Sequence, residues 1–343
     1  LFGVAAYLFI DPKPGPSIDQ QIDAAEALLA HERPRAAIDS LNRILENKNI
    51  DLAQKGRIHL LLARSVEMGQ KLEKLNIERN HWTIIHQTQK ALENGITPDA
   101  DLHQRMADSY RELNRPADAI EHYRKAVMLD PTRTIGVQRR VIELQLQLQE
   151  HDAAAVSLST YLAQKDLAGG ERAWAHLATA KLLVMSQKHA DATTALNAAL
   201  AAIPELSDDP TRNLERITQG EIRHFQGVCA LSFGRADEAE KYFAAARQLL
   251  TLQHPLDAEA AYHMARICEA RDETQEAIAI YNEILASHPD APVAGLARLG
   301  RAINRIAQGD DLAGLSDFDE LVKRASQQNS PRAVDRQILL KGL

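Results

Sequence analysis

The residues best suited to chemistry in this sequence are two cysteines and 13 histidines. His81 and His86 are five positions apart, whereas a spacing of four would place two imidazoles on one helix face for a metal ion. Cys229 and Cys268 have no second cysteine at the C-x-x-C spacing. Glycine-rich phosphate loops, the nucleophile elbow and the H-E-x-x-H motif are also absent. The sequence therefore predicts no catalytic residue, no cofactor site and no metal site.

The charge of the chain argues against nucleic acid as a partner. Lysine and arginine total 40 against 47 aspartate and glutamate residues, which gives a formal net charge of −7. Proteins that bind nucleic acid usually carry a basic stripe, because neutralised phosphates supply most of their affinity. No such stripe is visible, and the low aromatic content of 4% favours helices packed through small residues over sheets. We therefore expect a protein or peptide partner and no nucleic acid.

An uncharged stretch opens the chain. Leu1–Ile10 is apolar throughout, and residues 11–17 form a proline-rich linker. Ten residues are too few for a bilayer, which needs about 20, so we expect the end of a transmembrane or signal segment that anchors the protein in a membrane. The flank lacks the excess of basic residues that marks the cytoplasmic side, which predicts repeats outside the cytoplasm. The alternatives are a cytoplasmic location and a short helix that covers the first hairpin.

One spacing pattern recurs along the rest of the chain. Its best example is residues 100–133, where small and aromatic residues stand at the eighth, eleventh, twentieth, twenty-fourth and twenty-seventh places and proline stands at the thirty-second. These residues are Ala107, Tyr110, Ala119, Tyr123, Ala126 and Pro131. The last three places before the proline lie on one helix face, so a small residue there lets two helices approach and an aromatic residue fills the space beside it.

This pattern resembles the tetratricopeptide repeat, which has a period of about 34 residues. The resemblance implies an all-α fold, a right-handed α-solenoid of about eight helical hairpins that bury their apolar faces only by stacking on one another. We expect this solenoid over residues 18–330 and the start of a further helix over 331–343. The expected units lie near 18–51, 56–98 (divergent), 100–133, 134–167, 173–206, 220–253, 258–291 and 293–326.

The resemblance also implies that the first helices of the hairpins line a concave groove for a partner. Aromatic side chains beside arginine and lysine are typical anchors for a peptide, although an ordinary solvated face would show the same residues. Some relatives clamp a C-terminal carboxylate with lysine and asparagine, but Gln104 and Asp108 hold two of those places here. The groove candidates are Arg105, Arg139, Trp174, Lys181, His224, Tyr262 and Arg266.

The predicted function is a non-enzymatic scaffold for protein–protein interaction, similar to membrane-anchored tetratricopeptide scaffolds of bacteria. One alternative is that the chain is the non-catalytic arm of a larger enzyme. Another is self-assembly through the groove or the ends of the solenoid. Cys268 holds a core place of its unit and Cys229 adjoins one, so we expect both thiols to be buried and inert.

Overall fold

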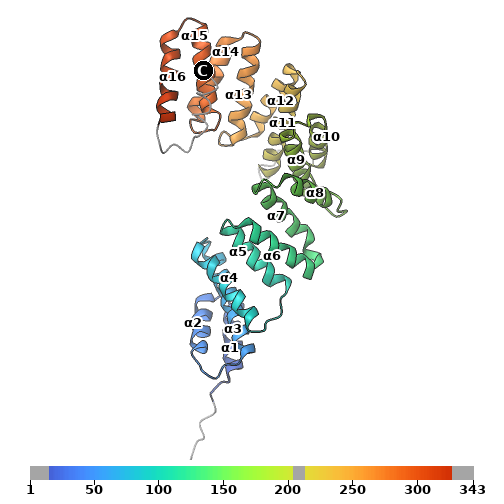
Figure 1. Cartoon of the computed structure of the whole chain (residues 1–343), viewed down its shortest axis with the longest axis vertical. Coiled ribbons are helices and arrows are strands. Elements are labelled where there is room, and N and C mark those ends of the chain that lie inside the picture. Colours follow the sequence, from blue (N-terminus) through green and yellow to red (C-terminus); the bar gives the residue numbers. More distant parts are fainter. Residues whose placement is uncertain (1–14, 204–212, 327–343) are drawn as a thin grey trace, which may run out of the picture. The chain divides into compact units, whose positions relative to one another are not determined.

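The described part of the chain is entirely helical. The computed structural model describes residues 15–203 and 213–326, which contain sixteen α-helices, one short 3₁₀ helix (η1, Pro131–Arg133) and no strand (Figure 1). The helices follow one another as eight successive pairs. The first helices are α1 (Ile18–Ala30), α3 (Leu52–Glu73), α5 (Ala100–Glu112), α7 (Thr134–Gln147), α9 (Gly169–Met185), α11 (Asn213–Ser232), α13 (Pro255–Ala270) and α15 (Ala294–Ala307).

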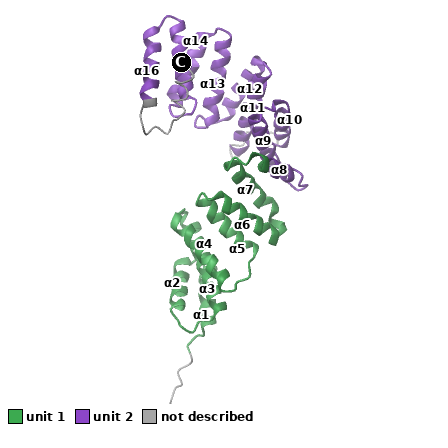
Figure 2. Ribbon diagram, viewed as in Figure 1, with its two compact units in different colours: residues 1–154 green, residues 155–343 purple. Residues whose placement is uncertain are grey.

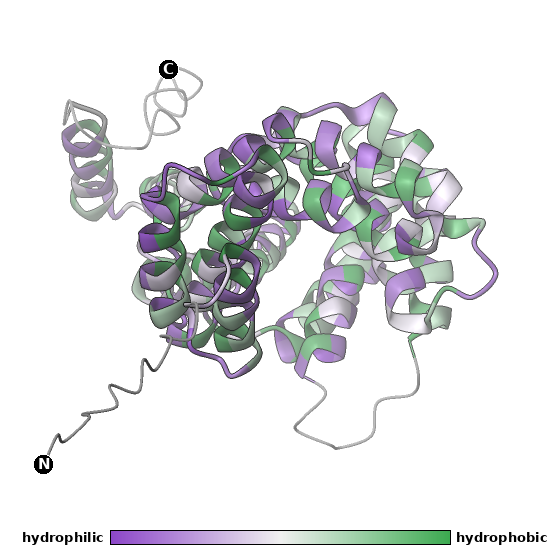
Figure 3. Cartoon of the chain, turned by 90° about the horizontal axis from the view of Figure 1, so that it is seen from below, coloured by the Kyte–Doolittle hydropathy of each residue, from purple (hydrophilic) through white to green (hydrophobic). Residues whose placement is uncertain are grey.

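The second helices complete the pairs and confirm the predicted all-α repeat fold. They are α2 (Pro34–Leu45), α4 (Glu78–Glu93), α6 (Pro116–Leu129), α8 (His151–Leu162), α10 (His189–Ala202), α12 (Ala236–Leu249), α14 (Thr274–Ser287) and α16 (Asp311–Ser326). Most consecutive helices pack together, such as α3 with α4 and α11 with α12. First helices of neighbouring pairs also touch, as α1 touches α3 and α11 touches α13. Hydrophobic and hydrophilic residues alternate around these helices (Figure 3).

The chain divides into two compact units, residues 1–154 and residues 155–343 (Figure 2). Each unit has its own buried clusters. In unit 1, one cluster joins α1, α2 and α3, and another joins α4 to α7 around Tyr123. In unit 2, successive clusters lie around Leu196, Phe243 and Tyr281.

The core follows the repeat pattern. Ala119 and Tyr123 are both fully buried, and so are Ala277 and Tyr281 at the same places of a later unit. Tyr123, Tyr281 and Phe243 are among the largest fully buried side chains of the described residues. These aromatic residues are therefore solenoid core, because each fills the space that a small residue leaves between packed helices.

The same turn ends the first helix of every pair. In each turn a residue at positive φ follows the helix, and the next amide donates to the carbonyl oxygen five residues back, as Arg115 does to Tyr110. This is a Schellman-type cap, which satisfies carbonyl groups that the helix end leaves free. The residues at positive φ are Glu32, Lys74, Asn114, Gln149, Gln187, Gly234, Asp272 and Gly309.

The predicted membrane anchor needs correction. Leu1–Ile10, which carried that prediction, lies outside the described residues, as does the predicted further helix at 331–343. Among the residues that the structure describes, no helix combines the length and the apolar composition that a bilayer crossing requires. The helices here are amphipathic, with charged faces that a hydrocarbon core about 30 Å thick does not accept. The part of the chain that the structure describes thus shows no membrane anchor, which contradicts the predicted membrane-anchored location.

Candidate functional site

A polar pocket of unit 1 lies on its first helices. It has a volume of about 540 Å³ and is lined by α3, α5 and α7, by the α3–α4 loop, and by His81 and Ile84 of α4. α3 is long, at 22 residues, and ends on Lys74 at positive φ. The loop that follows therefore reaches over to α5, which closes one side of the pocket.

Hydrogen bonds hold this loop in place. The Gln70 carboxamide oxygen accepts from the Ile77 amide at 2.9 Å, and Asn76 Nδ2 donates to Glu112 Oε2 at 2.8 Å. His81 Nε2 lies 2.6 Å from Asn76 Oδ1. Burial lowers the pKa of His81, so the neutral imidazole donates to that oxygen. Asn76 is thus oriented from both sides.

The pocket lining carries more positive than negative groups. Five basic side chains face three carboxylates, a formal surplus of two positive charges, although the whole chain has a net charge of −7. The basic residues are Lys71, Lys74, Arg105, Arg111 and Arg140, and the carboxylates are Glu67, Asp108 and Glu112. The surplus is local, so it arises from how the helices are brought together.

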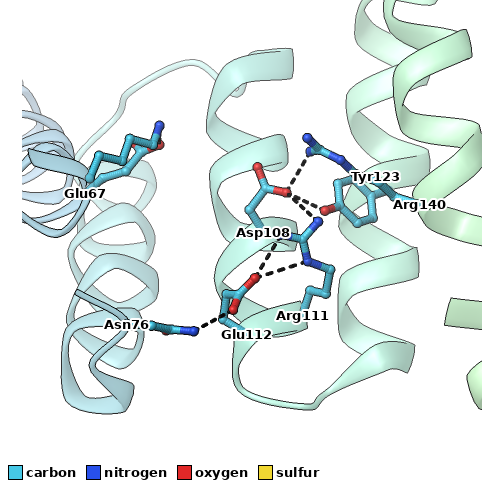
Figure 4. Close-up of polar contacts among 8 residues, drawn as sticks. Glu67, Asn76, Asp108, Arg111, Glu112, Tyr123 and Arg140 are labelled. Carbon is cyan, nitrogen blue, oxygen red and sulfur yellow. Dashed lines mark hydrogen bonds and ion pairs between the residues drawn. The ribbon is translucent and has the colours of Figure 1, made fainter. Parts of the chain in front are cut away.

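Asp108 of α5 is the central acceptor (Figure 4). Its Oδ1 accepts from the Tyr123 hydroxyl of α6 and, at 2.8 Å, from Arg140 Nη1 of α7. Arg111 Nη1 lies 3.8 Å from the same oxygen. Burial, and then the hydrogen bond to Asp108, raises the pKa of Tyr123, which keeps the phenol protonated as a donor. One carboxylate therefore joins three helices.

The other two carboxylates are also engaged. Glu67 accepts from Arg105 Nε and from Lys71 Nζ, each at 2.6 Å. Burial alone would raise the pKa of Glu67, but these two hydrogen bonds outweigh it and lower the pKa. Glu112 accepts from Arg111 Nη2 at 2.8 Å, which lowers its pKa most. Glu67 and Glu112 therefore stay ionised near neutral pH.

Lys74 differs from the other basic groups of the pocket. Its side chain is exposed, and it forms no ion pair with any residue that the structure describes. Arg111 and Arg140 are each more than a third exposed, so part of each guanidinium still meets solvent. The pocket thus presents N–H donors that the protein's own carboxylates do not use.

The structure places only one predicted groove candidate, Arg105, in this pocket. Arg139 is not part of the lining and pairs with Glu143 on its own helix at 3.0 Å. Its neighbour Arg140, which was not among the predicted groove residues, lines the pocket instead. Lys74 was also missed, because it belongs to the divergent unit, where the repeat pattern gives no register.

The remaining candidates lie in unit 2. Lys181 Nζ pairs with Glu221 Oε2 at 2.6 Å and lies 5.5 Å from the Phe225 ring centre. Tyr262 is half-buried against Tyr281, with ring centres 6.2 Å apart, and Arg266 pairs with Glu269 at 2.5 Å. The structure thus brings Tyr262 and Arg266 together on α13 and places Lys181 on α9.

Trp174 and His224 are less available. Trp174 packs edge-on against Tyr161, with ring centres 6.0 Å apart. The His224 side chain is only 2% exposed. Burial, followed by repulsion from His263 and Lys181, lowers the pKa of His224 to about 3. A buried neutral imidazole such as this one contributes to packing, and a partner in the groove would not reach it directly.

The described residues hold no cluster of three or more histidine, cysteine, aspartate or glutamate side chains arranged for a metal ion. Cys229 and Cys268 are both buried as free thiols. Burial raises the pKa of each thiol, which disfavours the reactive thiolate.

Comparisons with known proteins place this fold. Models of the tetratricopeptide repeat match residues 100–133 and residues 219–290. The C-terminal part of a tetratricopeptide repeat-containing protein from Cytophaga hutchinsonii superposes with a TM-score of 0.54 at 12% identity, over 80% of this chain and 98% of that one. A chain of the APC/C hetero-tetramer Cut9–Hcn1 gives a TM-score of 0.52 at 14% identity, over 96% of this chain and 56% of that one.

Identities this low show a shared fold alone. No protein with a curated description matches the sequence significantly. The two family-model matches lie in different units, and the helix pairs between and around them repeat the same turn and the same small-and-large packing. Residues 100–133 and 219–290 are thus tetratricopeptide repeats, and their fold of paired helices extends over the described residues of both units.

Proposed function

We propose that the chain is a non-enzymatic scaffold that binds an extended segment of a partner protein in the unit 1 pocket. The observation that carries this proposal is the pocket itself, which three successive first helices line with polar side chains. Its volume of about 540 Å³ falls within the range of about 300–1,000 Å³ that is usual for ligand pockets. Repeats of this kind support protein interaction in general, and the pocket supplies a specific place for it.

Unit 2 provides a second surface for a partner. Tyr262 and Arg266 lie one helical turn apart on α13, where a half-buried aromatic ring and a guanidinium offer an anchor of the kind found at interface hot spots. Lys181 adds a cation on α9. In this proposal the unit 1 pocket gives the primary contact and these residues of unit 2 give a separate one.

The test begins with peptides selected without bias. Random dodecapeptides displayed on phage are panned against the full chain, and the selected peptides are then mapped by hydrogen–deuterium exchange. We expect protection at α3, α5 and the α3–α4 loop. Protection confined to the second helices α2, α4 and α6 would contradict the proposal.

A pair of variants sharpens this test. Gln104→Trp places a bulky ring in the pocket, and Gln89→Trp makes the same change at an exposed position of α4 outside the lining. Because a filled pocket excludes the ligand, Gln104→Trp should weaken binding of the selected peptides at least about tenfold, or about 1.4 kcal/mol, and Gln89→Trp should not. Equal binding by both variants would place the site elsewhere.

A further inference from the structure

The lining of the unit 1 pocket indicates what kind of segment it takes. We propose that the pocket selects an acidic segment of a partner, one with aspartate or glutamate side chains on neighbouring turns or at alternate positions. This proposal rests on the function proposed above. The inference depends on three features of the pocket: the surplus of positive charge, the unused donors, and the kinds of side chain that line it.

The first feature is charge. The pocket concentrates five cations against three carboxylates within a concave surface, in a chain that is acidic overall. Low-dielectric walls focus such a field and reduce screening, so a ligand carboxylate gains more here than on an open surface. A basic ligand would meet a net repulsion instead.

The second feature is the balance of donors and acceptors. Each of the three carboxylates already receives at least two donors: Glu67 from Lys71 and Arg105, and Glu112 from Arg111 and Asn76. Arg140, in contrast, carries five N–H groups and donates to one acceptor among the described residues, Asp108 Oδ1, and Lys74 donates to none of them. A ligand that brings acceptors fits this surplus, and charge-assisted hydrogen bonds to carboxylates are about twice as strong as neutral ones.

The third feature separates an acidic peptide from a nucleic acid, which is also anionic. Proteins that bind single-stranded nucleic acid stack bases on aromatic rings. No phenylalanine, tyrosine or tryptophan is among the described residues that line this pocket. The lining therefore favours carboxylates on a peptide over phosphates that carry bases.

Fluorescence anisotropy with three labelled dodecapeptides tests the inference on the full chain. The peptides alternate serine with glutamate, glutamine or lysine. We expect the glutamate peptide to bind at least about tenfold more tightly than the glutamine peptide, and this advantage to shrink between about 0.05 M and about 0.3 M NaCl as salt screens the charges. Equal affinity for the glutamate and glutamine peptides would overturn the inference, and so would tighter binding of a twelve-nucleotide single-stranded DNA.

Matched variants test whether the pocket is responsible. Arg140→Gln and Lys74→Gln should each weaken binding of the glutamate peptide about threefold to tenfold. Arg139→Gln and Lys125→Gln remove the same charge outside the lining and should have little effect. If Arg139→Gln weakened binding as much as Arg140→Gln, the general field of the protein and not the pocket would hold the peptide.

One variant should gain affinity, which a folding defect would not produce. Glu112→Gln raises the surplus of the pocket from two to three positive charges and should tighten binding of the glutamate peptide about threefold, whereas Glu143→Gln, outside the lining, should not. No gain from Glu112→Gln would count against the acidic preference.

The outcomes distinguish this inference from the function on which it rests. If phage-selected peptides protect α3 and α5 but carry no acidic residues, the scaffold function holds and the acidic preference is wrong. If neither the selected peptides nor the glutamate peptide protects α3 and α5, both are wrong.

Discussion

Gly300 of α15 lies directly against the ring of Tyr281 of α14. A Cβ atom built on Gly300 would stand 2.5 Å from Cζ of that ring, closer than any normal contact. The tyrosine cannot yield, because it is fully buried and its hydroxyl donates to Glu269 Oε1 at 2.9 Å. Neighbouring helix pairs therefore touch here through a glycine that no larger residue can replace without movement.

Substitution of this glycine should destabilise unit 2. Gly300→Ala forces the Tyr281 ring out of its site, and overpacking of this kind usually costs about 1–3 kcal/mol. Gly136→Ala in α7 is the matched control, because no atom lies within 4 Å of its added Cβ. Urea unfolding followed by circular dichroism measures both. A Gly300→Ala chain as stable as the wild type would show that the contact relaxes freely.

Acid should weaken unit 2 through His224. The folded pKa of His224 is about 3 and the unfolded value about 6.5, so the unfolded state binds the proton first and stability falls as pH drops below about 6.5. Between pH 8 and pH 5 this histidine alone should cost about 2 kcal/mol. His263, also with a lowered pKa, acts in the same direction, whereas Glu259, with a raised pKa, acts in the opposite one.

His224→Leu isolates this effect, because it removes the titration and leaves the neighbouring groups in place. The difference in melting temperature between pH 8 and pH 5 should be smaller in the variant than in the wild type. The same change at the exposed His86 should leave the difference as it is in the wild type. If wild type and His224→Leu lost equal stability, another group would be responsible.

The shared turn predicts a stabilising change. Gln187 has φ of 58°, a left-handed conformation that a residue with a Cβ adopts at a cost. Gln187→Gly should raise the free energy of unfolding by about 0.5–1 kcal/mol, since glycine has no such cost at the residue after a helix. The reverse change, Gly234→Ala at φ of 72°, should lower it by a similar amount. Chemical denaturation measures the free energy of unfolding of both variants. A lower value for Gln187→Gly than for the wild type would contradict this explanation.

The two thiols should react slowly in the folded protein. Both are buried, and burial raises the pKa of each, so little thiolate is present at neutral pH. A colorimetric thiol reagent should therefore find both groups only after denaturant is added. Rapid reaction of either thiol without denaturant would show that its helix pair opens readily.

Much of the fold could be predicted from the sequence because each repeat position carries one packing role. The packing roles of these residues can be predicted within a single repeat, because a small residue and a large one four places later must meet between two helices. Examples are Ala119 with Tyr123 and Ala277 with Tyr281. The opening Leu1–Ile10 could not be interpreted in the same way. A short apolar run has no period to test, and the anchor was inferred from it without a full span.

The candidate site was harder to predict because it depends on contacts between units of the repeat. Arg139 and Arg140 differ by one position, about 100° around α7, and only the packing of α7 on α5 decides which of them reaches Asp108. Lys74 and Asn76 enter the pocket because α3 is 22 residues long and carries the α3–α4 turn to α5; the repeat pattern predicts a turn there but not the extra length of the helix.

The position of Asp108 links the pocket of unit 1 to the packing of its helices. Its carboxylate is the shared support of α5, α6 and α7, and Arg140, one of its donors, also faces the pocket. A ligand that binds Arg140 therefore contacts the same guanidinium group that joins α7 to α5. By thermodynamic linkage, a ligand that favours one arrangement of α5 and α7 should bind more tightly when that arrangement is already favoured, by the factor with which the ligand shifts that equilibrium.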